Sequence, residues 1–442
     1  MRTRGLWIGT VLLVLLAGGI WWSNKSEEAR AKRPPADAPP KIIDMPEDQL
    51  RKVEIRRAAG ETTVLENKSG KWEITAPKPF AVDPQPSSSL ISSLCSLTSD
   101  RIVEQKASDL SPYGLAKPGV EVVLTKKDGK SLRLLLGDET PTGNDCFASL
   151  QGDPRVFTVY SYVKSAIDKN SNDLRDKRLL TFDSDKLIRV ELAAKGQNLE
   201  FGKNNQNEWQ ILKPRPLRAD GGQVEELIRR LKDAKMDLSV SAEDAKKAAA
   251  GFASGTQVAL AKVTDAAGTQ QLQLRKDKDK NYYGKSSAVE GVYKVPADIG
   301  EGLDKGLDDF RNKKVFDFGW NDPTKLDVRD GAKQTSYQKS GEKWMSGGKQ
   351  MDSTAIQTVI DKLRDLAASK FPDKGFAAPE LEFTVTSNDG KRAEKVALSK
   401  SGNDWLARRE NEPTLYQLDA KVVEELQKAI AGVKEAAPPP KK

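Results

Sequence analysis

The chain has 442 residues, 37 % hydrophobic and 31 % charged, a balance that allows about three domains of ~150 residues and excludes a wholly disordered chain. Its 72 basic and 64 acidic residues leave a net charge of +8 without a basic stripe interleaved with aromatic residues, so we expect no nucleic-acid partner. Histidine is absent, which excludes Ser-His-Asp and Cys-His nucleophiles and any zinc site that requires imidazole.

Residues 1–22 are predicted to form a transmembrane anchor. Two arginines precede an apolar run, Leu6–Trp22, which spans roughly 25 Å as a helix. The alternative is a signal peptide cleaved after small residues such as Ala17 and Gly19, but the run continues to Trp22, which favours an uncleaved anchor. No cysteine follows the run, which excludes a lipoprotein. Basic residues lie on both sides of it, and the basic tail before it has the form of an export signal, so we expect the C-terminal bulk to be exported.

Residues 23–46 are predicted to form a stalk. Four prolines between positions 34 and 40 favour an extended backbone that rises ~3.1 Å per residue. At the other end of the chain, residues 435–442 are predicted to be a short tail of proline and lysine.

Between the stalk and the tail, the sequence repeats itself at a spacing of about 135 residues. Trp72, Trp209 and Trp344 each lie in a similar strand-like segment, which we expect to end at the tryptophan. One tryptophan per copy is typical of a core residue. The alternative role is a platform on which sugar rings stack.

An aspartate and an amphipathic helix follow each tryptophan. Asp83, Asp220 and Asp352 precede apolar residues at offsets 7, 8 and 11, which form one face of an α-helix. These apolar residues are Leu90, Ile91 and Leu94 in the first copy, Leu227, Ile228 and Leu231 in the second, and Val359, Ile360 and Leu363 in the third. Aspartate is a favoured N-cap, so we expect the three aspartates to cap helices and not to act in catalysis.

Alternating apolar residues after each helix predict hairpins of a half-buried antiparallel sheet, with turns at Asp128-Gly129 and Asp389-Gly390. Each copy then closes with a further strand and a second short helix. The fold class is therefore predicted to be α+β, three tandem copies of a module that packs a helix on an antiparallel sheet. The predicted copies are residues 47–182, 183–318 and 319–434.

The connectors between copies also repeat. Leu174-Arg175-Asp176-Lys177 matches Phe310-Arg311-Asn312-Lys313, and Phe182 matches Phe318. A repeated connector indicates junctions that pack in a fixed way. We expect Arg175, Asp176 and Lys177 to form a patch of salt bridges between modules.

No catalytic, cofactor or metal site is predicted. Asp277, Asp279 and Asn281 resemble the start of a calcium loop, but the required glycine and glutamate are missing, which favours a polar hairpin tip. Gly347-Gly348-Lys349 lacks the first glycine and the hydroxyl residue of a phosphate loop, which indicates a turn. Chemistry that uses only carboxylates stays open as a third alternative, because the sequence singles out no acidic pair.

The chain has two cysteines, Cys95 and Cys146, and both lie in the first copy. Two interpretations stay open: a disulfide in an oxidising compartment, or two separate, half-buried thiols, since the sequence does not fix their distance in space.

The first copy resembles the bacterial domain-of-unknown-function 4340 family. The resemblance rests on Trp72-Glu-Ile-Thr-Ala-Pro77, Asp83, Leu110-Ser-Pro-Tyr-Gly-Leu-Ala-Lys-Pro118, Leu136-Gly137 and Leu174-Arg-Asp-Lys177. It covers the first two copies, roughly residues 50–318, and the third more weakly. The Tyr-Gly-Leu element is absent from the second copy, where Ala249 to Ser254 stand, and the third copy has Gly375-Phe376 before Pro379.

The resemblance implies a protein anchored in the bacterial inner membrane by a single pass, with its bulk in the periplasm or outside the cell. It also implies a partner among gliding-type ABC transporter components, and it brings no catalytic residues. We therefore expect a non-enzymatic accessory or scaffold protein of an envelope export system, partnered by a transporter permease or companion subunit. The alternative is an extracytoplasmic module that binds glycan or peptide. The sequence does not identify a small-molecule ligand, the transported substrate or the oligomeric state.

Overall fold

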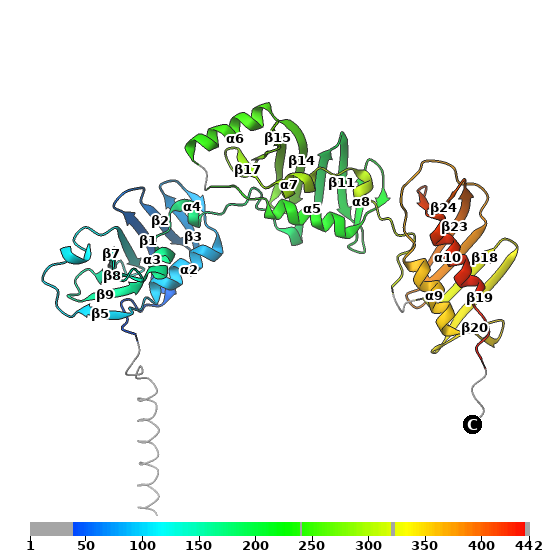
Figure 1. The fold of residues 1–442 in the computed structure, drawn as a ribbon, viewed down its shortest axis with the longest axis horizontal. Helices are drawn as coiled ribbons and strands as arrows, with labels where there is room; N and C mark the ends of the chain where they lie inside the picture. Colours follow the sequence, from blue (N-terminus) through cyan, green and yellow to red (C-terminus); the bar gives the residue numbers. More distant parts are fainter. Residues whose placement is uncertain (1–38, 239–240, 320–322, 438–442) are drawn as a thin grey trace, which may run out of the picture. The chain divides into compact units, whose positions relative to one another are not determined.

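The computed structural model describes residues 39–238, 241–319 and 323–437 (Figure 1). The predicted anchor, most of the predicted stalk and the last five residues lie outside the described residues. Within the described ranges, no helix has both the length and the apolar character needed to span a membrane. The chain divides into two compact units, Met1–Lys177 and Arg178–Lys442, of which the first contains one antiparallel sheet and the second contains two.

The first unit contains a nine-stranded sheet with the order β4-β3-β2-β1-β6-β7-β8-β9-β5. Its strands are β1 (Leu50–Arg57), β2 (Thr63–Lys68), β3 (Lys71–Ala76), β4 (Phe80–Ala81), β5 (Arg101–Glu104), β6 (Val120–Lys126), β7 (Ser131–Glu139), β8 (Asp145–Leu150) and β9 (Val156–Tyr160). Its helices are α2 (Pro84–Cys95), α3 (Ser161–Ile167) and α4 (Ser171–Leu174), with short 3-10 turns η1 (Glu47–Gln49) and η2 (Ser111–Tyr113).

The first sheet of the second unit has eight strands in the order β13-β12-β11-β10-β14-β15-β16-β17. These are β10 (Arg189–Ala194), β11 (Gln197–Lys203), β12 (Trp209–Lys213), β13 (Leu217–Arg218), β14 (Thr256–Asp265), β15 (Gly268–Lys276), β16 (Tyr282–Ser286) and β17 (Tyr293–Val295). The accompanying helices are η3 (Ser184–Lys186), α5 (Gly221–Asp233), α6 (Ala242–Ser254), α7 (Ala297–Leu303) and α8 (Leu307–Phe310).

The second sheet of this unit repeats the same order, β21-β20-β19-β18-β22-β23-β24-β25. Its strands are β18 (Lys325–Asp330), β19 (Lys333–Ser340), β20 (Lys343–Ser346), β21 (Lys349–Gln350), β22 (Leu381–Ser387), β23 (Arg392–Ser401), β24 (Asp404–Arg409) and β25 (Leu415–Leu418). Two helices accompany it, α9 (Ser353–Arg364) and α10 (Ala420–Ala431).

All three modules are built in the same way. A meander of four antiparallel strands leads into a helix, a second four-stranded meander leads into another helix, and the first strands of the two meanders pair at the centre of the sheet. The predicted hairpins are confirmed, with the turn glycine Gly129 at φ +85° and Gly390 at φ +84°. The mixed α/β character and the three similar antiparallel sheets agree with tandem copies of one module.

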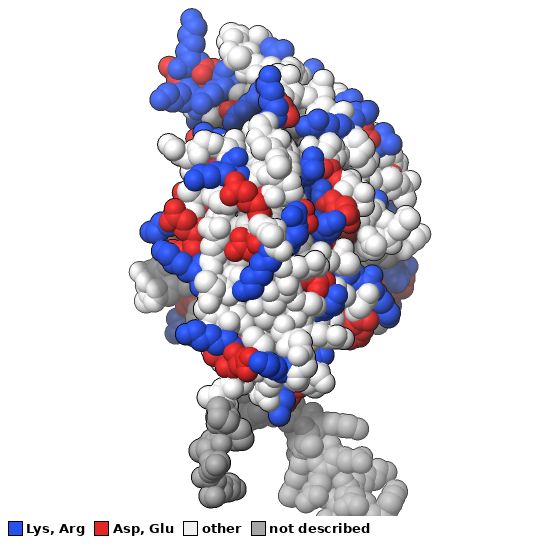
Figure 2. All heavy atoms as spheres, turned by 90° about the vertical axis from the view of Figure 1, so that its right-hand side faces the viewer, with Lys and Arg blue, Asp and Glu red and all other residues white. Residues whose placement is uncertain are grey.

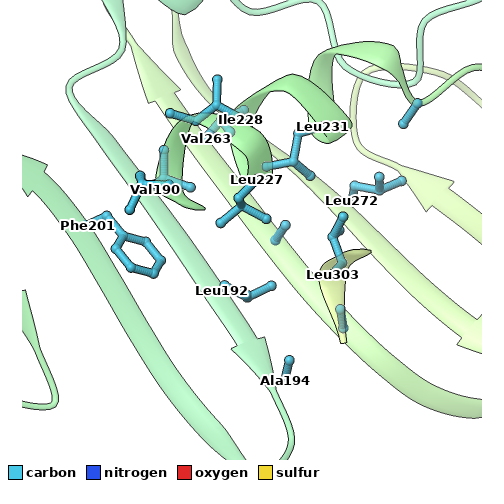
Figure 3. Close-up of a cluster of buried hydrophobic side chains, with 14 of the residues drawn as sticks. Val190, Leu192, Ala194, Phe201, Leu227, Ile228, Leu231, Val263, Leu272 and Leu303 are labelled. Atoms are coloured by element: carbon cyan, nitrogen blue, oxygen red, sulfur yellow. The ribbon is translucent and has the colours of Figure 1, made fainter. Parts of the chain in front are cut away.

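Each module buries its own hydrophobic core between one sheet face and its helices. In the second module, α5 lies across the sheet and its predicted face, Leu227, Ile228 and Leu231, points at strand residues that include Val190 and Val263 (Figure 3). The apolar face of the helix, with its period of 3.6 residues, therefore packs on the sheet face formed by every second strand residue. The sequence pattern predicts this packing.

The other face of the sheets carries polar side chains in ion pairs within and between strands. In the first sheet, Arg56 bonds both Glu54, at 2.7 Å, and Glu121, at 3.1 Å. In the third sheet, Arg329 pairs with Glu382. On the face of the molecule shown in Figure 2, basic and acidic side chains likewise alternate and do not gather by sign. Such partly exposed pairs contribute roughly 0–1 kcal/mol each and indicate a solvated surface.

The connectors begin the following module, which corrects the predicted boundaries. Leu179, Leu180 and Phe182 are buried in the core of the second module, and Val315, Phe316 and Phe318 in that of the third. Ile42, Ile43 and Met45 of the predicted stalk, likewise, are part of the core of the first module. The repeated element is thus a basic residue followed by two apolar residues, any residue and a third apolar residue. It occurs at 41–45, 178–182 and 314–318.

Two isolated β-bridges fix the ends of each module. The incoming segment pairs with the chain just after the first helix, through Lys41 and Thr98, Arg178 and Lys235, and Lys314 and Ala367. The outgoing segment pairs with the residue before the capping aspartate, through Val82 and Arg175, Ala219 and Arg311, and Met351 and Glu435. The predicted tail therefore begins too early, because Glu435 and Ala436 close the third module as the connectors close the first two.

Candidate functional site

The three recurring aspartates are helix N-caps, as predicted. The Oδ1 atom of Asp83 accepts from the backbone N–H of Gln85 at 3.2 Å, and Asp220 and Asp352 accept from backbone N–H groups of their own first turns. The carboxylates therefore satisfy backbone donors that the helix leaves without partners.

The repeat tryptophans are core residues. Trp209 is 8 % exposed and Trp344 is 4 % exposed, and the half-buried Trp72 packs against the core of the first module. Each tryptophan stands at or next to the first residue of its strand, so the expectation that the strand ends there is wrong. The residues before each tryptophan form the turn of a hairpin, whose positive-φ positions break the period of the preceding strand. The burial of Trp209 and Trp344, and the packing of Trp72 against the core, remove the reason to expect a sugar-binding platform on these side chains.

The two motifs that fail as ion-binding loops have structural roles. Asp277 accepts from the backbone and side chain of Asn281 and from the Tyr283 hydroxyl at 2.9 Å, in the tip between β15 and β16. Burial raises the pKa of Asp277, but these hydrogen bonds outweigh burial and the net pKa is lowered. Gly347 and Gly348 form the positive-φ turn between β20 and β21. Among the described residues, no three His, Cys, Asp or Glu side chains gather so as to hold a metal ion.

The connector residue Arg175 closes the first module. Its guanidinium lies 4.1 Å from the centroid of the Phe80 ring, and the backbone N–H of Asp176 donates to Ala81. Arg311, at the equivalent place in the second module, bonds Asp308 at 3.3 Å and lies 3.6 Å from the centroid of Phe371. The patch of salt bridges predicted for Arg175, Asp176 and Lys177 stays a prediction.

The family-like motifs of the first module meet on the reverse face of its sheet. Phe147 points away from the core, because its neighbours Cys146 and Ala148 face the core. The Tyr113 ring covers it, with centroids 5.0 Å apart, and the Tyr113 hydroxyl donates to Glu104 at 2.7 Å. The Leu110–Pro118 motif is therefore a cover over the reverse face.

Glycine is required where the two motifs touch. A Cβ on Gly137 would lie 2.1 Å from the carbonyl oxygen of Tyr113, and one on Gly114, at φ +65°, would lie 2.4 Å from the carboxyl carbon of Asp138. The glycines let β7 and the cover approach at backbone distance.

The other modules cover the same position with different residues. In the second module, Tyr283 points to the reverse face and packs with Phe252 of α6. In the third, Gly375 comes close to Leu406, and Phe376 stacks on Arg408 at 4.4 Å. The Tyr-Gly-Leu element is thus replaced by other apolar cover in the copies that lack it.

We expect Gly137→Ala to destabilise the first module by about 1–3 kcal/mol, because the new methyl group overlaps a backbone oxygen that only a shift of the cover can relieve. Urea denaturation of the full chain, with hydrogen exchange in β7 as the local readout, measures the effect. Gly119→Ala is the control, since no atom lies within 4 Å of its Cβ position. Equal stability of the two variants would contradict the close contact.

A cluster of ionic groups surrounds the second connector. The Asp317 carboxylate contacts Arg218, Arg392 at 3.4 Å and Arg409 at 3.7 Å. Glu394 accepts from the backbone N–H of Asp317 at 3.0 Å and from Arg409 at 3.1 Å. The cluster thus ties the connector to the third sheet.

Further bonds extend this cluster. Glu412 accepts from Arg409 at 2.7 Å and from the Tyr416 hydroxyl at 3.0 Å. Burial lowers the pKa of Arg409, but the nearby carboxylates outweigh it and raise the pKa overall. Arg218, from the second module, donates to the carbonyl of Lys314 at 2.9 Å and contacts the Tyr416 hydroxyl at 3.1 Å. The three arginines and three carboxylates of the cluster balance in charge.

Both cysteines are free and fully buried in the core of the first module, so the disulfide alternative is not realised. Burial raises the pKa of each thiol from its ordinary 9.0 to about 11. Glu47 adds to the effect at Cys95, and Lys164 opposes it at Cys146.

We expect neither thiol to react with a disulfide reagent at pH 8 in the folded chain, because the thiolate is the reactive form and both groups are buried and protonated. Both react once urea unfolds the module. Because the unfolded thiols ionise near 9 and the folded ones near 11, their contribution to stability is constant below pH 9 and falls between pH 9 and 11. Comparison with a Cys95→Ala, Cys146→Ala variant isolates this slope. Rapid labelling of the native chain at pH 8 would contradict the expected protection of the two thiols.

Sequence reasoning missed two features. The connector pattern at 41–45, 178–182 and 314–318 is readable in the sequence, and aligning the copies on it would have placed the boundaries. The other is an exposed pair of tyrosines, Tyr160 and Tyr162, where β9 leads into α3. Its only sequence signal is two tyrosines separated by one residue at a junction that has no aromatic residue in the other copies.

Comparison with protein families gives one match, found twice. The family described as "Domain of unknown function (DUF4340)" matches residues 72–215 and again residues 209–381. Each match begins at a repeat tryptophan and crosses one connector, so the shared sequence unit includes the junction as well as the sheets. No curated protein matches the chain significantly. The two matches extend over most of the three modules, and the chain therefore belongs to the DUF4340 family.

Proposed function

We propose that the chain is a non-enzymatic scaffold or accessory protein of an ABC-type, gliding-type export system, anchored in the bacterial inner membrane with its modules outside the cytoplasm. Its partner is a permease or companion subunit. The apolar run at Leu6–Trp22 supports the anchor, and the family resemblance supports the partner class.

The packing of the connectors carries the proposal. Each connector closes one module and enters the core of the next, and only three positions separate the outgoing bridge at Arg175 from the incoming bridge at Arg178. The recurring aspartates cap helices and the recurring tryptophans fill cores, so the conserved pattern within the chain builds and joins modules. Repeat proteins commonly use the surfaces of their modules to bind partners.

In-cell photo-crosslinking tests the proposal. A photoreactive amino acid replaces Lys130, Lys278 or Lys391, which are exposed lysines at or near hairpin tips, one in each module. Mass spectrometry then identifies what each position captures. Capture of a permease or its companion subunit is the expected result. Recovery of glycan or a diffusible ligand alone, with no ABC-system protein from any position, would contradict the proposal and favour the binding-module alternative.

A further inference from the structure

The first module has an exposed aromatic pair that its fold does not need. The rings of Tyr160 and Tyr162 stack with centroids 5.5 Å apart and planes 13° from parallel. Tyr160 is 44 % exposed and Tyr162 is 71 % exposed. A stacked pair held in one geometry offers a large aromatic surface at low entropic cost, a feature typical of residues that dominate protein interfaces.

The surroundings of this pair are acidic. The Tyr160 hydroxyl donates to Asp100 at 2.7 Å, and Asp145 lies directly opposite Tyr160 across β8 and β9, on the same face of the sheet. The hydrogen bond to Asp100 raises the pKa of Tyr160 most, and the charge of Asp100, burial and the charge of Asp145 add to this effect. The Oδ1 atom of Asp145 is buried without a hydrogen-bond partner in the described part of the chain. Lys164, the basic residue of α3, donates to the carbonyl of Gly137 at 3.0 Å.

The pair is specific to the first module. The positions equivalent to Tyr160 and Tyr162 are Pro296 and Asp298 in the second module and Asp419 and Lys421 in the third. Because the other two modules form the same strand-to-helix junction without aromatic residues, packing does not explain the tyrosines.

The pair lies next to the point where the chain enters the module. The backbone N–H and the hydroxyl of Ser99 donate to the carbonyl of Pro40, at 2.8 and 3.0 Å. Asp100, the partner of Tyr160, is the next residue. This part of the module is therefore reached first along the chain from the predicted anchor.

We propose that Tyr160, Tyr162 and Asp100 form a docking point for a lysine or arginine side chain of a membrane protein of the export system. This inference rests on the proposed function and names its docking surface and chemistry. Aromatic faces attract cations through the ring quadrupole, and the Asp100 carboxylate supplies the opposite charge. A cation also suits the field of Asp145, whose buried oxygen has no donor to offset it.

The test places a photoreactive amino acid at Tyr162 in the full chain, in cells, with Asp298 and Lys421 as matched positions in the other modules. We expect position 162 to capture a permease or companion subunit at a segment that contains lysine or arginine. We expect Asp100→Asn or Tyr160→Ala in the same chain to lower this yield by roughly two- to thirtyfold. Asp100→Asn keeps an acceptor for the Tyr160 hydroxyl, and unchanged proteolysis of the variants confirms that the module is folded.

The outcomes of the crosslinking experiment distinguish the docking point from the scaffold proposal. Capture of the partner from positions 298 or 421, or from the exposed lysines, but not from 162 would overturn the docking point and leave the scaffold proposal standing. A captured segment without a basic residue, a yield that does not change in the Asp100→Asn variant, or capture of lipid or glycan alone would overturn the cationic partner. Failure to capture any ABC-system protein from any position would overturn both proposals.

Discussion

Replacing Phe316 with alanine is expected to lower the free energy of unfolding of the third module by about 3–5 kcal/mol. Phe316 is fully buried and belongs to the core of the third module, although it lies in a connector that the sequence pattern places at the end of the second. Removing its ring leaves a cavity beneath that sheet. Hydrogen exchange of the full chain measures the effect, with faster exchange expected in α9 and unchanged exchange in α5.

Phe310→Ala is the matched control, because Phe310 lies six positions earlier and packs on Phe201 in the core of the second module, with ring centroids 4.8 Å apart. This variant is expected to loosen α5 and spare α9. A fragment of residues 314–436 is likewise expected to fold, and one of residues 319–434 to remain unfolded. If Phe316→Ala instead made hydrogen exchange faster in α5, the assignment of this connector to the third module would be wrong.

The elements that sequence reasoning predicted are those with a local cause. A capping residue and an apolar face of period 3.6 predict the helices after Asp83, Asp220 and Asp352. An Asp-Gly turn between two segments of alternating apolar residues predicts the hairpins at Asp128-Gly129 and Asp389-Gly390. In both cases the residues that make the signal also make the structure.

The elements that it misplaced depend on contacts distant in sequence. The sequence shows that Phe182 and Phe318 are equivalent. Whether such a connector packs in the preceding or the following module depends on a bridge to a segment more than 50 positions away, such as Arg178 to Lys235. The sequence also does not predict the cover on the reverse face. Tyr113 and Phe252 both pack on that face of their own module, but the segments that contain them have different sequences. The Tyr160 and Tyr162 pair is visible only once exposure is known.

Glu394→Ala is expected to destabilise the third module by about 3–5 kcal/mol, because it leaves the buried guanidinium of Arg409 short of a carboxylate. The side chains of Glu394 and Arg409 are 4 % and 12 % exposed. Urea denaturation measures the loss. Glu382→Ala, which breaks the more exposed pair with Arg329 in the same sheet, is the control and is expected to cost less than about 1 kcal/mol.

A double variant, Glu394→Leu with Arg409→Met, separates stability from positioning. It removes one charge of each sign and leaves Arg218 and Arg392 on Asp317, so we expect it to be more stable than Glu394→Ala. The double variant also removes the bond from Glu394 to the backbone N–H of Asp317, which fixes the connector. If the double variant is as stable as the parent but exchanges faster at Asp317, the cluster serves to fix the connector and not to hold the sheet together. A double variant as unstable as Glu394→Ala would show that the carboxylate itself stabilises the fold.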